Sequence, residues 1–322
     1  METLRDWLAR PTATMLVILV GLVAVFSALE PEAFPTMVNL RGTLADAAIL
    51  LVLAVGATFV IITAGVDLSV GSVLVFSSVL GAKVMDRLGN AGAGAIVGGL
   101  IVSVAAGGAW GLVNGALVAK AKVPPFVVTL GTLGAAYGLS LVISGGLDVR
   151  SVPKGLVEFG NGRVLGIPNI ALIAGTIALV AGAVLALTVF GRWTYAIGSN
   201  EESARRAGIA VDRQFIGVYV LAGSMAGLGG FLSLARFGTT TIAGNTTTNL
   251  QVITAVVIGG TSLFGGKGWI LGTTIGVFVP IVLTKGFIIT GVQPYWQFVA
   301  VGVVLILAVL VDQRRRLKAA GR

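Results

Sequence analysis

Long apolar runs recur along the whole chain, and each is close to the length of a helix that crosses a bilayer. A membrane-spanning helix needs about 20 apolar residues, because the bilayer core offers no water to satisfy exposed backbone amides. The predicted spans cover residues 13–29, 44–64, 66–82, 93–118, 124–144, 169–190, 214–235, 250–264, 269–289 and 295–311. Because the runs recur, the first is expected to be a span and not a cleavable signal peptide. The sequence predicts an all-α polytopic membrane protein with about ten transmembrane helices, forming a single domain over residues 1–322.

Basic residues indicate the orientation of these spans. The formal net charge is +9, and with the N-terminus inside, most Lys and Arg residues fall in cytoplasmic segments, including the cluster 314–318 after the last span. This positive-inside bias predicts that both termini are cytoplasmic, and it accounts for the basic charge without a nucleic-acid partner. The longest external loop, 145–168, is either a solvated connector or part of a docking surface for an external partner.

The composition argues against catalytic and metal chemistry. The chain has no Cys and no His, so it has no thiolates and lacks the most common general base and metal ligand. The glycine-rich segment 259–268 resembles a phosphate-binding loop, but that pattern needs Gly where Thr261 stands and Ser or Thr where Gly268 stands. We therefore expect neither a metal site nor a bound cofactor, and any ATP and Mg²⁺ would be used by a partner.

Two spans are interrupted in corresponding ways. Residues 60–72 read VIITAGVDLSVGS and residues 257–268 read VIGGTSLFGGKG, which predicts broken helices. Irregular backbone at membrane depth survives only where protein buries it or a wet cavity borders it, and paired breaks of this kind point to a transport pathway. Asp67 either belongs to that pathway or caps the following helix by accepting from the amide of Ser69 or Val70. A third candidate break, at Pro124-Pro125, is either functional or a simple helix start.

The segment 191–209, GRWTYAIGSNEESARRAGI, contains a short polar helix between two apolar spans. Ser199 is the expected N-cap, with Glu202 three residues later as in a capping box, and Gly208 is the expected C-terminal cap. The two acids lie in the first turn and the two arginines in the last turn, where each sign suits the helix dipole. So well-marked a helix on the cytoplasmic side is expected to dock a partner.

Four long segments resemble a known family. Residues 65–72, 111–133, 191–209 and 255–277, with PYWQ at 294–297, are similar in sequence and order to the permease subunits of ribose-type ABC importers for monosaccharides. The resemblance implies a multi-pass permease of the bacterial inner membrane that works with a second permease copy or paralogue, a cytoplasmic ATPase with two fused nucleotide-binding domains, and an extracytoplasmic sugar-binding protein. The segment matching 195–208 resembles the coupling helix that seats in the ATPase. The chain departs from the family pattern at 249–251, where Asn-Leu-Gln replaces Glu-Leu-Asp, so no charged role is expected there.

These observations predict the transport subunit, not an enzyme, of an ATP-driven importer for a monosaccharide or related polyhydroxylated solute. The residues expected to couple to the ATPase are Gly198, Asn200, Glu201, Glu202, Ala204, Arg205, Arg206 and Gly208. Hydroxyl, amide and aromatic groups suit a neutral sugar. The candidates for the translocation pathway are Asp67, Ser69, Asn114, Phe126, Thr129, Thr132, Thr254, Thr261 and Trp296. The alternative is an ion-coupled secondary transporter, which would need titratable groups in the core, where only Asp67 and Asp46 are candidates.

Overall fold

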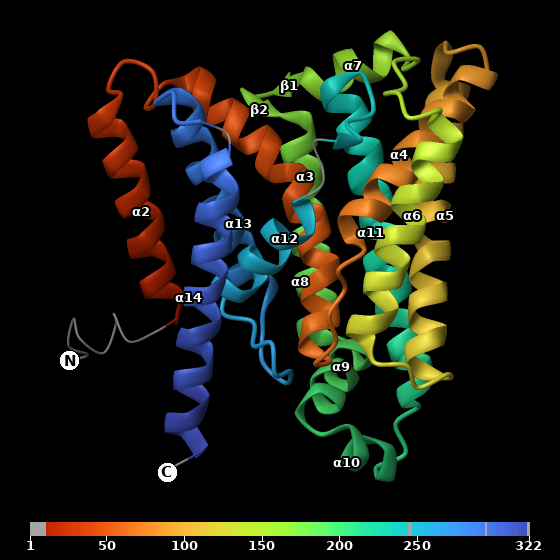
Figure 1. Cartoon of the computed structure of the whole chain (residues 1–322), viewed down its shortest axis with the longest axis vertical. Helices are drawn as coiled ribbons and strands as arrows, with labels where there is room; N and C mark the ends of the chain where they lie inside the picture. The colour runs from red at the N-terminus through yellow and green to blue at the C-terminus, as the bar shows by residue number, and fades with distance from the viewer. Residues whose placement is uncertain (1–10, 244–246, 294, 321–322) are drawn as a thin grey trace.

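The computed structural model describes residues 11–243, 247–293 and 295–320, and nearly all of its regular structure is helical (Figure 1). The helices are α2 (Pro11–Leu29), α3 (Met37–Ile62), α4 (Val70–Arg87), α5 (Gly92–Ala119), α6 (Pro125–Ser144), α7 (Lys154–Asn161), α8 (Asn169–Leu187), α9 (Val189–Ser199), α10 (Glu201–Arg206), α11 (Val211–Phe237), α12 (Thr248–Ile258), α13 (Ile270–Ile289) and α14 (Tyr295–Ala320). One small antiparallel hairpin, β1 (Arg163–Val164) and β2 (Ile167–Pro168), pairs Val164 with Ile167. The predicted all-α membrane fold is confirmed.

Each of the ten predicted spans coincides with a helix, although not all are equally suited to cross a membrane. Seven described helices are long and apolar enough by themselves: α3, α5, α6, α8, α11, α13 and the Tyr295–Arg314 part of α14. The apolar parts of α2 and α12 are shorter, Met15–Leu29 and Thr248–Ile258. Helix α4 carries Lys83, Asp86 and Arg87 in its last two turns, which makes it more polar than a typical span.

Both predicted helix breaks are present, and they correct the bounds of two predicted spans. Helix α3 ends at Ile62 and α4 begins only at Val70, not at residue 66, because the intervening chain is irregular. Helix α12 ends at Ile258, and the predicted span to residue 264 was too long, because residues 259–269 form the second irregular segment. At the third candidate, Pro125 opens α6 and Pro124 is its N-cap, so this site is a simple helix start.

Helix α3 lies at the centre of the bundle. Its apolar window is 89% buried, compared with 6% for α14 at the periphery. Helices α4, α5, α6 and α11 gather on one side of α3, and α2, α12, α13 and α14 on the other (Figure 1). Helices α9 and α10 form the lower end of the molecule in this view, on the side where α2 begins and α14 ends, whereas α7 and the hairpin lie at the upper end. The external loop 145–168 is thus built from regular elements, and α7 packs against α11.

Glycines allow a close backbone contact between α5 and α11. Gly107, Gly111 and Gly115 recur every four residues on α5 and so share one face of the helix. A Cβ at Gly111 would lie 2.2 Å from the carbonyl oxygen of Tyr219, and one at Gly107 would lie 2.1 Å from that of Gly223. No side chain fits between backbones this close, so the small residues allow the two helices to touch.

We expect Gly111→Ala to destabilise the protein, because the added methyl group has to push α5 away from α11. Overpacking of this kind costs about 1–3 kcal/mol, which would lower Tm for thermal unfolding in detergent by several degrees. The matched control is Gly131→Ala on α6, where nothing lies within 4 Å of the new Cβ. Equal melting temperatures for the two variants would contradict this account of the α5–α11 contact.

Candidate functional site

The short helix α10 has a different N-cap from the one predicted. Asn200, not Ser199, adopts the cap position, and its Oδ1 accepts a hydrogen bond from the amide of Ser203 at 2.8 Å. Ser199 is the last residue of α9, and its hydroxyl donates instead to the carbonyl of Tyr195 at 2.9 Å. The predicted capping box between Ser199 and Glu202 was therefore wrong, because α9 continues through Ser199 and uses that side chain for its own last turn.

The predicted C-terminal cap of α10 is confirmed. Gly208 has φ of +82°, the left-handed conformation that glycine adopts most easily. Its amide donates to the carbonyl of Arg205 at 3.1 Å, and the amide of Ile209 donates to the carbonyl of Ala204, also at 3.1 Å. These two bonds form a Schellman motif, which ends the helix and satisfies its last carbonyls.

Ion pairs hold α10 in shape and attach it to neighbouring segments. Two pairs with a spacing of four residues form within the helix: Glu201 with Arg205, and Glu202 with Arg206. Arg205 also reaches Asp212 at the start of α11 at 2.9 Å, and Lys122 from the α5–α6 loop approaches the same carboxylate oxygen at 3.1 Å. The hydrogen bonds that Arg205 donates to Asp212 and Glu201 raise its pKa. Exposed pairs contribute only about 0–1 kcal/mol each, so their main effect is to fix the direction of α10.

Helix α9 joins α10 to both broken segments. Gly266, in the second break, donates its amide to the carbonyl of Ile62 at the end of α3 at 2.9 Å. Gly198 of α9 lies against this contact, since a Cβ there would be 1.7 Å from the Ile62 oxygen and 2.7 Å from the Gly266 nitrogen. Tyr195 donates its phenol to the carbonyl of Gly268 at 2.6 Å, and burial raises the pKa of that phenol. A movement of α10 therefore reaches both breaks through a few short contacts.

Gln214 anchors α9 from the α11 side. Its side chain is buried, and Nε2 donates to the carbonyl of Phe190 and to the hydroxyl of Thr194, both at 2.9 Å. The sequence analysis did not single out Tyr195, Gln214 or Asp212. The sequence does place Asp212 as an acid in the first turn of α11, where it suits the helix dipole. Its ion pairs could not be predicted in this way, because the partners lie on other segments of the chain.

Five of the predicted pathway residues surround the first break. Asp67 Oδ1 accepts from the amide of Ser69 at 2.8 Å and from its hydroxyl at 2.6 Å. The amide group of Asn114 on α5 donates to the Ser69 hydroxyl at 3.0 Å, and the hydroxyl of Thr132 on α6 donates to Asn114 Oδ1 at 2.8 Å. All four side chains are buried. The expected bond from the Ser69 amide to Asp67 is present, but the predicted cap role was wrong, because α4 begins at Val70 and Ser69 is its N-cap, without a side-chain capping bond. The carboxylate instead begins a chain of hydrogen bonds across three elements.

The carbonyl of Val66 extends this cluster. It accepts from the hydroxyl of Thr129 on α6 at 3.3 Å and from the phenol of Tyr219 on α11 at 3.4 Å. Sequence reasoning found Thr129 but not Tyr219, because nothing in the local pattern of α11 brings that residue to the break. The irregular backbone is thereby satisfied by protein groups, as membrane depth requires.

The other four pathway candidates lie apart from this cluster. Thr254 and Thr261 flank the end of α12, and their buried hydroxyl oxygens have no hydrogen-bond partner among the described residues. Phe126 and Trp296 are 57% and 58% exposed on the surface of the single chain. The first break therefore collects the amide and hydroxyl groups, whereas the two aromatic side chains are largely exposed.

Comparisons with known proteins identify the family. The profile of a family described as the permease component of the branched-chain amino acid transport system matches residues 39–309. The chain belongs to this family of membrane permeases. The ribose import permease protein RbsC of Escherichia coli strain K12 is 38% identical over 308 residues, which cover 94% of this chain and 93% of the relative. The fructose import permease protein FrcC of Rhizobium meliloti is 34% identical, covering 96% and 87%. The D-allose transport system permease protein AlsC of E. coli K12 is 36% identical, covering 92% and 90%.

These relatives confirm the family resemblance and the prediction of a transport subunit in the bacterial inner membrane. Their names describe permease components and not enzymes. No solved structure matches the permease.

In the permease, Asn200→Ala should fray α10, whereas Ser199→Ala should leave it intact. Loss of a helix cap costs about 0.5–2 kcal/mol, which would appear as faster amide hydrogen exchange at Ser203. Because Ser199 bonds only within α9, its replacement serves as the matched control. Faster exchange in the Ser199 variant alone would restore the original cap assignment.

Asp67→Asn should be milder than Asp67→Leu. Asparagine keeps an oxygen that can accept from Ser69, whereas leucine leaves a buried amide and hydroxyl without that partner, at a cost of about 1–3 kcal/mol. Thermal unfolding in detergent measures the difference in stability, and uptake measures the difference in transport. Equal loss in both variants would assign a charge-specific role to the carboxylate.

Proposed function

We propose that the chain is, over residues 1–322, the membrane-spanning permease domain of an ATP-driven importer for a monosaccharide. The main support for this proposal is the way in which α10 is capped and ion-paired and α9 is packed against the two breaks. A capped and ion-paired helix projects from the bundle, and its supporting helix contacts both irregular segments. Because the chain itself has no phosphate-binding loop, ATP would be hydrolysed by a partner. A helix built in this way can transmit the partner's conformational change to the transmembrane helices.

The proposed docking site for the ATPase is α10 with its flanking caps, residues 198–208. Glu202 and Arg206 have side chains that are 75% and 78% exposed, so they remain available to a partner while they pair with each other. Helix α10 lies on the side where α2 begins and α14 ends (Figure 1). Together with the basic cluster after the last span, this supports cytoplasmic termini and an ATPase with two nucleotide-binding domains on that face.

The opposite face is the proposed approach for an external sugar-binding protein. Helix α7 and the β1–β2 hairpin form that end of the molecule (Figure 1). A second permease copy or paralogue would complete the membrane unit, and transport would proceed as outward and inward access alternate.

Two lines of argument favour a sugar as the solute. Three relatives are named for ribose, fructose and allose. The groups gathered at the first break are mainly hydroxyls and an amide, which suit a neutral polyhydroxylated molecule. An amino acid would need partners for two charges, and the cluster described here offers only the carboxylate of Asp67, which already accepts two bonds.

The same cluster weakens the ion-coupled alternative. Coupling to an ion requires a group that can change its charge or coordinate a cation during transport. Asp67 is engaged by Ser69, and Asp46 pairs with Lys285 at 2.5 Å and with Arg236 at 3.4 Å, joining α3, α13 and α11. Both carboxylates therefore have structural partners in this conformation.

The proposal is tested by reversing the charges of α10. Glu201→Lys with Glu202→Lys should abolish uptake and solute-stimulated ATP hydrolysis in the reconstituted importer, because the docking surface changes sign and both ion pairs within α10 are lost. Membrane insertion should remain normal, since α10 lies outside the spans. The matched control is Glu201→Asp with Glu202→Asp, which keeps the negative charge at the same two positions and should preserve uptake and stimulated ATP hydrolysis. Unchanged stimulation of ATP hydrolysis in the double variant would refute the docking role, and uptake that an ionophore abolishes but ATP depletion spares would favour ion coupling.

A further inference from the structure

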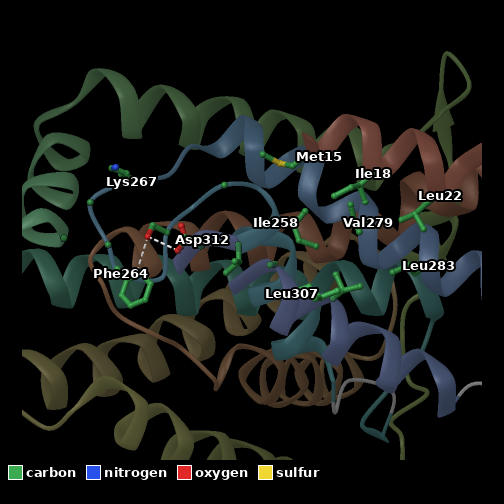
Figure 2. Close-up of a pocket in the computed structure, with 18 of the residues that line it drawn as sticks. Met15, Ile18, Leu22, Ile258, Phe264, Lys267, Val279, Leu283, Leu307 and Asp312 are labelled. Carbon is green, nitrogen blue, oxygen red and sulfur yellow. Dashed lines mark hydrogen bonds between the residues drawn. The ribbon is translucent and has the colours of Figure 1, made fainter. Parts of the chain in front are cut away.

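A large cavity lies beside the irregular segment between α12 and α13. Its volume is about 760 Å³, and its walls come from α2, α12, α13 and α14 together with residues 198–199 at the end of α9. Figure 2 shows that the cavity has two unlike ends. Leu22, Val279 and Leu283 lie at one end, and Phe264, Lys267 and Asp312 lie at the other.

The polar end carries one charge of each sign. Asp312, near the end of α14, accepts a hydrogen bond from the hydroxyl of Ser262 at 3.0 Å. Lys267 lies at the same end, in the irregular segment after α12. A ligand that complements this end carries both an anionic and a cationic group, whereas the rest of the cavity accepts hydrocarbon.

The cavity opens toward the surroundings of the bundle. Ile18 on α2 and Leu307 on α14 both line it, and they are 45% and 56% exposed. These two helices lie at the edge of the bundle (Figure 1). A molecule already dissolved in the bilayer can therefore enter between them, whereas a sugar would meet mainly apolar walls.

From this geometry we propose that the cavity binds a phospholipid of the cytoplasmic leaflet with an amine-containing headgroup, of the phosphatidylethanolamine type. Its acyl chain lies along Leu22, Val279, Leu283 and Leu307. Its ammonium group faces Asp312, and its phosphate faces Lys267. The acyl chain leaves one apolar environment for another and so gains little from the transfer itself. The contacts of the headgroup with Asp312 and Lys267 therefore decide which lipid is retained.

The lipid would lie next to the contact between α9 and the second break, and it can therefore affect how α10 is connected to the transmembrane helices. The cavity is lined by Gly198 and by Gly265 and Gly266, the residues through which α9 contacts the second break. A bound lipid fills the space behind that contact and supports it. We expect occupancy to stabilise the arrangement of α9 without any direct contact with the transported solute.

Native mass spectrometry of the purified full-length chain tests the proposal. The chain is incubated with mixed micelles that contain equal amounts of phosphatidylethanolamine and phosphatidylglycerol. We expect the wild type to retain phosphatidylethanolamine in preference to phosphatidylglycerol. Ala308→Trp fills the cavity and should lower retention by at least about tenfold. The matched control, Ile306→Trp, places the same ring on an exposed residue of α14 outside the cavity and should retain the lipid.

A second variant keeps the test decisive should Ala308→Trp fail to fold. Asp312→Asn preserves an acceptor for Ser262 but removes the negative charge, so it should abolish the preference for phosphatidylethanolamine while leaving total lipid retention similar. Three results would overturn the proposal: equal retention of the two lipids by the wild type, an unchanged headgroup preference in Asp312→Asn, or normal retention by a folded Ala308→Trp. A lipid-free dimer would also overturn it, because a second copy of the chain would then occupy the surface.

Discussion

The hydrogen bond from the amide of Gly266 to the carbonyl of Ile62 joins the end of α3 to the second irregular segment, the two places on which the proposed function rests. Irregular backbone cannot face lipid, so each broken segment needs partners within the protein. Through this bond, a backbone amide of the second break pairs with the last backbone carbonyl before the first break. Gly198 lies so close to the bond that no side chain larger than a hydrogen atom fits there. The segment that carries α10 is consequently fixed to the two places where the bundle departs from regular helix.

The two sides of the bundle are built differently around this contact. Between α5 and α11 the backbones touch through glycines, which gives a rigid unit with little space for side chains to rearrange. On the other side, α2 and α14 enclose a cavity beside the second break. Helix α9 packs against α3 and α11, and residues 198–199 at its end border the cavity. We expect the second break to be the more adaptable of the two.

The first break and the cavity serve different chemistry. Amide and hydroxyl groups from α5, α6 and α11 converge on residues 66–69, where they bond to one another and to the broken backbone. Apolar walls line most of the cavity near α14, which suits the hydrocarbon portion of a lipid more than a polyhydroxylated solute. The proposed roles in solute passage and in lipid binding thus follow from two separate distributions of polar groups within one helical bundle.

Features that depend on neighbours in sequence were predictable from the sequence alone. The positions of the spans, both breaks, the ion pairs of α10 and the left-handed Gly208 all follow from apolar run length, helical spacing and glycine's freedom at positive φ. Tertiary structure decided the rest. Asn200 became the cap because α9 extends through Ser199. Tyr219 joined the Val66 carbonyl from another helix, and Phe126 and Trp296 are exposed on the surface of the single chain. These outcomes depend on how distant helices pack, since the local pattern of a helix is much the same whichever neighbour it meets.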